Sequence, residues 1–159
     1  MTKATKLDQM DEMEIIHTIR AFNRNYVRSI GLLEKTMLNS DYSLTESQIL
    51  FIVHQQKKTT ATDINKILNL DEGYLSRIIK KLISKSLLTK KQSAVDKRCY
   101  EIMMTKKGIK VQEKLDQLST ESVRRVISTL AVEDRTELAL LFNRIMNMLY
   151  KDKPTSSIN

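Results

Sequence analysis

Basic side chains are concentrated in one short stretch of the chain. From Arg77 to Arg98 there are eight lysines and arginines but a single acidic residue, Asp96, whereas the whole sequence has 27 basic and 19 acidic residues. Ammonium and guanidinium groups bind phosphate oxygens, and a guanidinium can also donate two hydrogen bonds to the edge of a guanine. The stretch therefore has the residue types for binding a polyanion, and it shows no set of acid, base and nucleophile for catalysis.

The first half of this stretch is predicted to be a helix from Asp71 to Lys85. Its apolar residues recur at intervals of three and four, which indicates one buried face made of Leu75, Ile78, Ile79, Leu82 and Ile83. The opposite face has no acid and consists of Tyr74, Ser76, Arg77, Lys80, Lys81 and Lys85. Asp71 stands where its carboxylate can cap the helix N-terminus. A cationic helix face taken alone is often only a solvated surface, so its role depends on the elements around it.

Two shorter helices are predicted before the cationic one. We expect the first to begin behind a capping box of Thr45 and Gln48. The second, over residues 61–68, begins at Thr60 and turns tightly into the cationic helix. Two short helices joined by a tight turn form a helix-turn-helix.

Beyond the cationic helix the periodicity changes from helical to extended. Residues 87–91 can form a strand, and Tyr100, Ile102 and Met104 alternate with their neighbours as one face of a second strand does. A loop without glycine or proline joins the two. A helix-turn-helix followed by a hairpin is a winged helix, so the two elements that would touch DNA in such a fold are the two cationic ones.

Long amphipathic patterns flank this winged helix. One predicted helix runs from about Leu7 to Asn39 with a coiled-coil-like seam of Ile15, Ile19, Phe22, Tyr26, Ile30, Leu33 and Met37. After the hairpin, Thr105 caps another helix, and a break near Ala131 leads to a last amphipathic one. A small core can hardly cover so long a first helix, so we expect it to pair with helices of a second subunit. The expected interface is formed by Ile15, Ile19, Phe22, Leu138, Leu141, Phe142, Ile145 and Leu149.

Composition narrows the remaining functions. A net charge of +8 and a pI of about 9.6 suit a polyanionic partner. The single cysteine, Cys99, excludes an internal disulfide and a cysteine-based zinc site, and His17 and His54 have no second ligand at metal spacing. There is neither a signal sequence nor a stretch long enough to span a membrane. We therefore expect a cytoplasmic protein with no cofactor and no enzymatic activity.

Three motifs resemble the MarR family of bacterial transcriptional regulators. They are Leu70-Asp71-x-Gly73-Tyr74-Leu75-Ser76-Arg77, Asp96-x-Arg98 in the wing, and Thr105-x-x-Gly108 after it. The resemblance implies a mainly α fold with a small β-hairpin wing, namely a winged helix-turn-helix at residues 44–105 with dimerisation helices at 1–40 and 106–150. It also implies a homodimer that binds palindromic operators, commonly as a repressor relieved by a small ligand. Where the family often has proline before the aspartate, this chain has Ser93-Ala94-Val95.

A further set of motifs resembles the MarR-type half of proteins that are fused to a GNAT acetyltransferase. These motifs are Ile19-Arg20-x-Phe22-Asn23-Arg24, Ile30-Gly31-Leu32-Leu33 and Tyr42-Ser43-Leu44-Thr45-Glu46. No acetyltransferase sequence follows in this chain, so acetyl transfer is not expected. Residues 151–159 are expected to be a flexible tail.

The candidate DNA-binding residues of the helix have different expected roles. Arg77 is expected to bond a guanine edge, and Tyr74 or Ser76 a base or a phosphate. Gly73 would let the backbone approach closely, although tight packing explains a glycine there equally well. The lysines further along, Lys80 and Lys81, are expected to neutralise phosphates.

The wing supplies the remaining candidates. Lys97 and Arg98 are expected to enter or border the minor groove, where narrowing deepens the negative potential. Asp96 is expected to stabilise the wing by pairing with Arg98 or a nearby cation. We interpret Cys99 as a small strand residue and not as a redox sensor.

Two other functions fit the same charge distribution. One is a non-specific architectural DNA-binding protein, and the other is a winged-helix module that binds proteins and has lost DNA binding. Comparison of a palindromic operator with scrambled DNA distinguishes all three.

Overall fold

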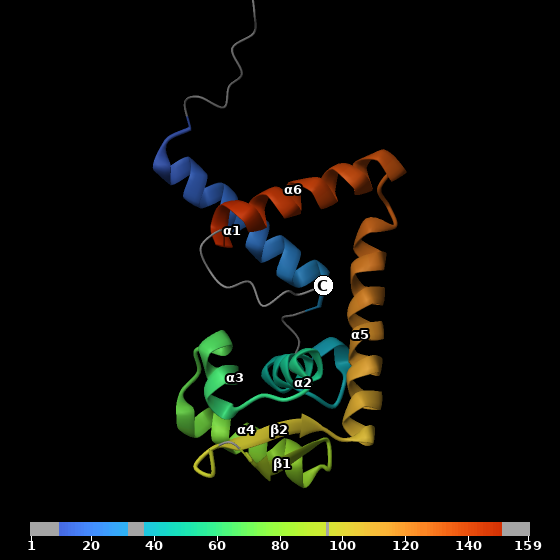
Figure 1. Cartoon of the computed structure of the whole chain (residues 1–159). Helices are drawn as coiled ribbons and strands as arrows, with labels where there is room; N and C mark the ends of the chain where they lie inside the picture. Colours follow the sequence, from blue (N-terminus) through green and yellow to red (C-terminus); the bar gives the residue numbers. More distant parts are fainter. Residues whose placement is uncertain (1–9, 32–36, 95, 151–159) are drawn as a thin grey trace, which may run out of the picture.

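The structure, a computed structural model, describes residues 10–31, 37–94 and 96–150. Three helices and a hairpin form a lobe, and α5 runs from the hairpin along one side of it to the turn before α6 (Figure 1). In chain order the elements are α1 (Glu12–Ser29), the 3-10 turn η1 (Met37–Asn39), α2 (Leu44–Gln56), α3 (Ala61–Leu68), α4 (Glu72–Ser84), β1 (Leu88–Gln92), β2 (Tyr100–Met104), α5 (Lys106–Ile127) and α6 (Val132–Tyr150). The predicted helix-turn-helix and wing are thus confirmed. No helix among the described residues is both long enough and apolar enough to cross a membrane.

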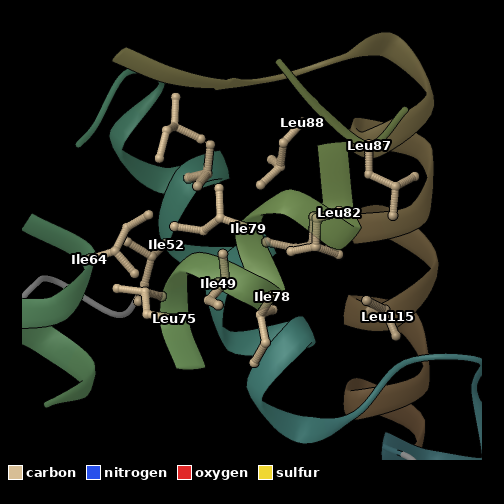
Figure 2. Packing of buried hydrophobic residues seen from close by; sticks show 13 residues of the cluster. Ile49, Ile52, Ile64, Leu75, Ile78, Ile79, Leu82, Leu87, Leu88 and Leu115 are labelled. Atoms are coloured by element: carbon tan, nitrogen blue, oxygen red, sulfur yellow. The ribbon is translucent and has the colours of Figure 1, made fainter. Parts of the chain in front are cut away.

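The hydrophobic core lies inside the lobe and orients α4. Most of the apolar stripe predicted for this helix is buried. Leu75, Ile78 and Ile79 are at most 7% exposed and Leu82 is fully buried, whereas Ile83 is only partly buried. Figure 2 shows these side chains meeting residues of α2, α3, β1 and α5. Because one whole face of α4 is fixed in this way, its polar face must point away from the lobe.

The wing is an antiparallel pair in which Leu88 lies opposite Met104 and Gln92 opposite Tyr100. A third pairing segment was not predicted from the sequence. Thr59, just before α3, donates its backbone N–H to the oxygen of Ile102 at 3.2 Å and accepts the N–H of Ile102 at 2.7 Å. The base of the wing is therefore hydrogen-bonded to the helix-turn-helix.

Side-chain caps account for most of the helix starts. Thr60, Asp71 and Thr105 each accept a backbone N–H of the first helical turn, as predicted. The predicted cap of α2 was wrong. Ser43 is its N-cap, and Ser43 and Glu46 exchange both bonds of the capping box, at 3.2 and 2.8 Å. Helix α2 therefore begins at Leu44, two residues before the predicted start.

The first helix is shorter than predicted. It begins at Glu12, behind a capping box of Asp11, and ends at Ser29 instead of Asn39. Gly31 follows the C-cap with φ +73°, a left-handed conformation that terminates helices and that glycine adopts without strain. Of the predicted seam, Met37 begins a separate 3-10 turn and Leu33 lies outside the described residues, as does the tail at 151–159.

Candidate nucleic-acid interface

The polar face of α4 is open to solvent. All the residues predicted on it to bind DNA are exposed, namely Gly73, Tyr74, Ser76, Arg77, Lys80 and Lys81. Its only acids are Asp71, the N-cap, and Glu72 in the first turn. Beyond that turn the exposed face has cations and neutral groups alone, which is the charge that a helix in a DNA groove needs.

The N-terminus of α4 is tightly built. Asp71 Oδ1 accepts the N–H of Tyr74 at 2.8 Å, and a Cβ added to Gly73 would lie 3.3 Å from that same oxygen. A side chain at position 73 would therefore press on the cap. The fold itself does not require a glycine at this position, because its φ is not positive and an added Cβ would meet no backbone atom.

Lys81 is held by a carboxylate of the lobe. Its Nζ lies 2.8 Å from Oε1 of Glu46, whose side chain is only 4% exposed, while the Lys81 side chain is 56% exposed. Glu46 thus joins the N-terminus of α2 to α4, with its other oxygen in the capping box. Burial raises the pKa of Glu46, but the Lys81 ammonium and the Ser43 N–H outweigh it and leave the pKa below its usual value. The expected phosphate ligand is therefore also an anchor of the helix.

The last turn of α4 is anchored in the same region. Lys85 Nζ lies 4.9 Å from the centre of the Tyr42 ring, and Lys85 O accepts a hydrogen bond from Lys107 Nζ at 2.9 Å. The cations of the helix therefore divide in two. Arg77 and Lys80 face solvent, while Lys81 and Lys85 contact residues that precede or begin α2.

The wing presents Lys97 and Arg98 at its exposed tip. Asp96 stabilises this tip differently from the prediction. Its Oδ1 accepts the backbone N–H of Arg98 at 2.9 Å, and its backbone oxygen accepts the N–H of Cys99 at 2.9 Å. Among the described residues no basic nitrogen lies within 4.0 Å of the Asp96 carboxylate. A backbone donor two residues away satisfies the carboxylate, which leaves the Arg98 guanidinium at the surface.

A cation on the wing also has an aromatic partner. Lys90 Nζ, on β1, lies 4.1 Å from the centre of the Tyr100 ring on β2. The two residues form part of the regular register of the hairpin. Such a contact restrains the lysine without neutralising it, so Lys90 keeps its charge on the wing.

The predicted dimerisation residues lie on helices that the lobe does not cover. No described residue of α1 or α6 is buried. The two helices meet through three aromatic rings, with centroid distances of 5.3 Å for Phe22–Tyr26, 6.0 Å for Phe22–Phe142 and 5.7 Å for Tyr26–Phe142. Leu138 and Phe142 are half-buried, and the other predicted interface residues are exposed: Ile15, Ile19, Phe22, Leu141, Ile145 and Leu149.

Comparison with known proteins agrees with this geometry. The sequence profile of the MarR family matches residues 42–100, from just before α2 to the start of β2. Residues 42–100 therefore match a MarR family domain. Its sequence is 27% identical over 99 residues to the HTH-type transcriptional regulator BilQ of Clostridium symbiosum (strain WAL-14163), covering 61% of this chain and 69% of BilQ.

Solved structures of other proteins share the fold. A mutant of MarR from E. coli in complex with operator DNA is 22% identical, with a TM-score of 0.66 over 86% of this chain and 99% of the other. YusO from Bacillus subtilis is 14% identical, with a TM-score of 0.68 over 87% and 99%. At these identities the similarity establishes the fold, a mainly helical winged helix with a two-stranded wing.

The partners of the lysines in this lobe were not predicted from the sequence. Glu46 and Tyr42 are far from α4 in the sequence, and Tyr100 was considered only as a strand residue. One signal was available, because Ser43-x-x-Glu46 has the capping-box form as clearly as Thr45-x-x-Gln48. It identifies the cap of α2, but nothing in it indicates Lys81 as the second partner of Glu46.

Cys99, interpreted from the sequence as a small strand residue, lies directly before β2. The thiol is exposed, and its Sγ lies 3.4 Å from Asp96 Oδ2. The hydrogen bond to that carboxylate and its negative charge raise the pKa of the thiol. A raised pKa lowers the fraction of thiolate, which is the reactive form.

The Glu46–Lys81 pair gives a stability prediction. Glu46→Gln should lower the free energy of unfolding by about 1 kcal/mol at neutral pH, since it removes a charge-assisted contact to a buried carboxylate. Because folding lowers the pKa of Glu46, the contribution is present above the unfolded-state pKa and is lost as the pH falls through the folded-state value. Urea unfolding at neutral and acidic pH measures both effects, and the variant should lose less stability in acid.

The matched control is Glu101→Gln, which removes the more exposed pair between Glu101 and Lys58 at 3.5 Å. Its cost should be smaller, because exposed ion pairs contribute little. Equal losses in the two variants would contradict the anchoring role of Glu46.

Proposed function

We propose that this protein is a homodimeric, sequence-specific DNA-binding transcriptional regulator of the MarR family that represses genes at palindromic operators and is released by a small ligand. The exposed face of α4, with Arg77 and Lys80 and no acid beyond the first turn, carries the proposal. The wing adds Lys90, Lys97 and Arg98. The similarity to BilQ, named as a transcriptional regulator, supports the function, and the operator complex of E. coli MarR supports its mode of binding.

In this proposal α4 enters the major groove. Arg77 bonds a guanine edge, Tyr74 and Ser76 contact a base or a phosphate, and Lys80 neutralises a phosphate. Because Gly73 has no side chain, the N-terminus of the helix can approach the DNA backbone closely. Lys81 adds charge to the same face while Glu46 holds it, so its phosphate contact is secondary to its anchoring role.

The wing contacts the adjacent minor groove. Lys97 and Arg98 are its proposed DNA ligands, and Asp96 keeps the tip in shape through the backbone N–H of Arg98. Because Asp96 bonds the backbone of Arg98 and not its side chain, the Arg98 guanidinium is available for a narrow, strongly negative minor groove.

The proposed dimer is built from residues 1–40 and 106–150, and the proposed DNA-binding lobe from 44–105. Helices α1 and α6 support this proposed dimer. Neither has a buried residue, and a second subunit would cover their exposed apolar side chains. Two copies related by a twofold axis would bring two recognition helices to half-sites about 34 Å apart, one turn of DNA.

Binding to a palindrome from the protein's own promoter tests the proposal. Fluorescence anisotropy at moderate salt should show the palindrome bound at least about 10³-fold more tightly than scrambled DNA of the same length. Equal affinities would favour a non-specific architectural protein. An absence of binding to either DNA by the purified dimer would favour a protein-interaction module.

Two single variants separate base recognition from phosphate contact. Arg77→Ala should cost roughly 1–3 kcal/mol of binding free energy on the palindrome and much less on scrambled DNA. Lys80→Ala should weaken both about equally and reduce the slope of log K against log salt by about one. Titrations at several salt concentrations measure both, and a uniform loss in Arg77→Ala would contradict its assignment to a base.

A further inference from the structure

A cavity of about 560 Å³ lies between α2 and α5. The wall from α2 includes Leu44 and Phe51, and the wall from α5 includes Leu115, so a large part of the lining is apolar. The two helices also contact each other through the hydrophobic core of the lobe, in which Leu115 is 3% exposed. A cavity of this size with apolar walls and a few polar groups is typical of a small-molecule site.

Two carboxylates line this cavity. They are Glu113 and Asp116, on successive turns of α5, and the lining, which also includes His54, has no lysine or arginine. Neither carboxylate lies within 4.0 Å of a basic nitrogen in the part of the chain that the structure describes. Although the chain has a net charge of +8, a cavity lined by two carboxylates and no lysine or arginine favours cationic ligands over anionic ones.

Two buried polar atoms in the lining have no hydrogen-bond partner among the described residues. They are Oγ of Ser47, a residue 5% exposed, and Oε1 of Gln112, a residue 6% exposed. Buried polar atoms nearly always have a partner, because leaving one unpaired costs free energy. The Gln112 oxygen can only accept, and the Ser47 hydroxyl can do so too, so both are suited to a donor group of a ligand.

We propose that the cavity between α2 and α5 binds a cationic molecule with an aromatic or otherwise apolar body, of the arylalkylamine class. The apolar body packs on Phe51 and Leu115, and the ammonium group lies near Glu113 and Asp116. This inference names the chemical class of the small ligand in the proposed function. It rests on that function only for the expected effect of the ligand on DNA binding.

Tryptamine is a suitable probe, with tryptophol as its neutral analogue and indole-3-propionate as its anionic one. The chain has no tryptophan, so indole fluorescence reports the ligand alone when tyrosine is not excited. Fluorescence anisotropy of each probe against the full-length protein, without DNA, should give tryptamine the highest affinity and indole-3-propionate the lowest.

Charge-removing variants locate the site. Glu113→Gln combined with Asp116→Asn should weaken tryptamine roughly fivefold to tenfold, as expected for two partly screened charges, and leave tryptophol unchanged. Glu121→Gln removes a carboxylate from the same helix outside the cavity lining and should change neither probe.

Three results would overturn the inference. They are no binding of tryptamine, equal binding of all three probes, or a loss in Glu121→Gln as large as in the double variant. Because these titrations contain no DNA, their failure leaves the proposed function standing. Conversely, failure of the operator titration leaves the ligand class standing. Addition of tryptamine to the operator complex then tests whether the two are coupled.

Discussion

Gly108→Ala should lower the free energy of unfolding by about 3 kcal/mol or more, which is the largest stability effect we expect from a single methyl group in this chain. A Cβ at this position would lie 2.0 Å from the backbone oxygen of Leu87 and 2.9 Å from its carbonyl carbon. Backbone atoms cannot rotate away, so α5 would have to move away from Leu87, the residue just before β1. Leu87 is fully buried, so the lobe has no free space for that movement.

The same displacement would break the start of α5. Thr105 Oγ1 accepts the N–H of Gly108 at 2.9 Å and donates to Ser86 O at 2.7 Å, so cap, helix and preceding loop share one hydrogen-bond network. Urea unfolding measures the loss. The protein concentration is kept fixed, because the stability of the proposed dimer would depend on it.

Gly73→Ala is the matched control, since it is the same change in another helix. There the added Cβ meets only the end of a side chain, Asp71 Oδ1 at 3.3 Å. The gain in helix propensity of about 1 kcal/mol opposes that contact, so the net change should be small. A loss in Gly108→Ala no larger than in this control would contradict the close approach of α5 to Leu87.

Features that depend on neighbouring residues could be predicted from the sequence. The buried stripe of α4 follows from spacing alone, and the caps at Thr60, Asp71 and Thr105 each involve residues three positions apart. The capping box of α2 shows where such reasoning stops. Ser43 with Glu46 and Thr45 with Gln48 have equivalent spacing, and only the packing of α2 in the lobe selects between them.

The end of α1 needed information that the hydrophobic pattern does not contain. The seam of apolar residues continues past Gly31, so periodicity alone extends the helix. The chain leaves the helix because Gly31 adopts φ +73°, followed later by Leu38 and Asn39, which also have positive φ. An isolated glycine in a helical pattern is tolerated often enough that the sequence did not decide the matter.

Counting charges did not show which of the cations the fold restrains. Eight basic residues lie between Arg77 and Arg98, but the fold gives three of them partners within the protein. Lys81 meets Glu46, Lys85 meets the ring of Tyr42, and Lys90 meets the ring of Tyr100. Glu46 is 35 positions before Lys81, so no local pattern relates them. The partners of Lys81 and Lys85 also hold α4 on the lobe, and the proposed base contact of Arg77 depends on that fixed position.

Ile145→Glu should convert the proposed dimer into monomers and lower operator affinity roughly 10²-fold or more. Ile145 lies on α6, where no described residue is buried, and its side chain is 45% exposed in the single chain. A twofold interface contains every substitution twice, so each dimer would bury two new carboxylates among apolar residues. A monomer contacts one half-site and loses the effective concentration that links the two.

Analytical ultracentrifugation and operator titration measure the two effects, and circular dichroism checks that the lobe is still folded. The lobe should persist, because its core contains no residue of α6. The matched control is Ile67→Glu on α3, which adds the same charge at a residue that is 40% exposed. Because Ile67 is far along the chain from the proposed dimerisation helices, this variant should remain dimeric. An Ile145→Glu protein that sediments as the natural chain does would place the interface elsewhere, and the apolar surface of α1 and α6 would then need a different partner.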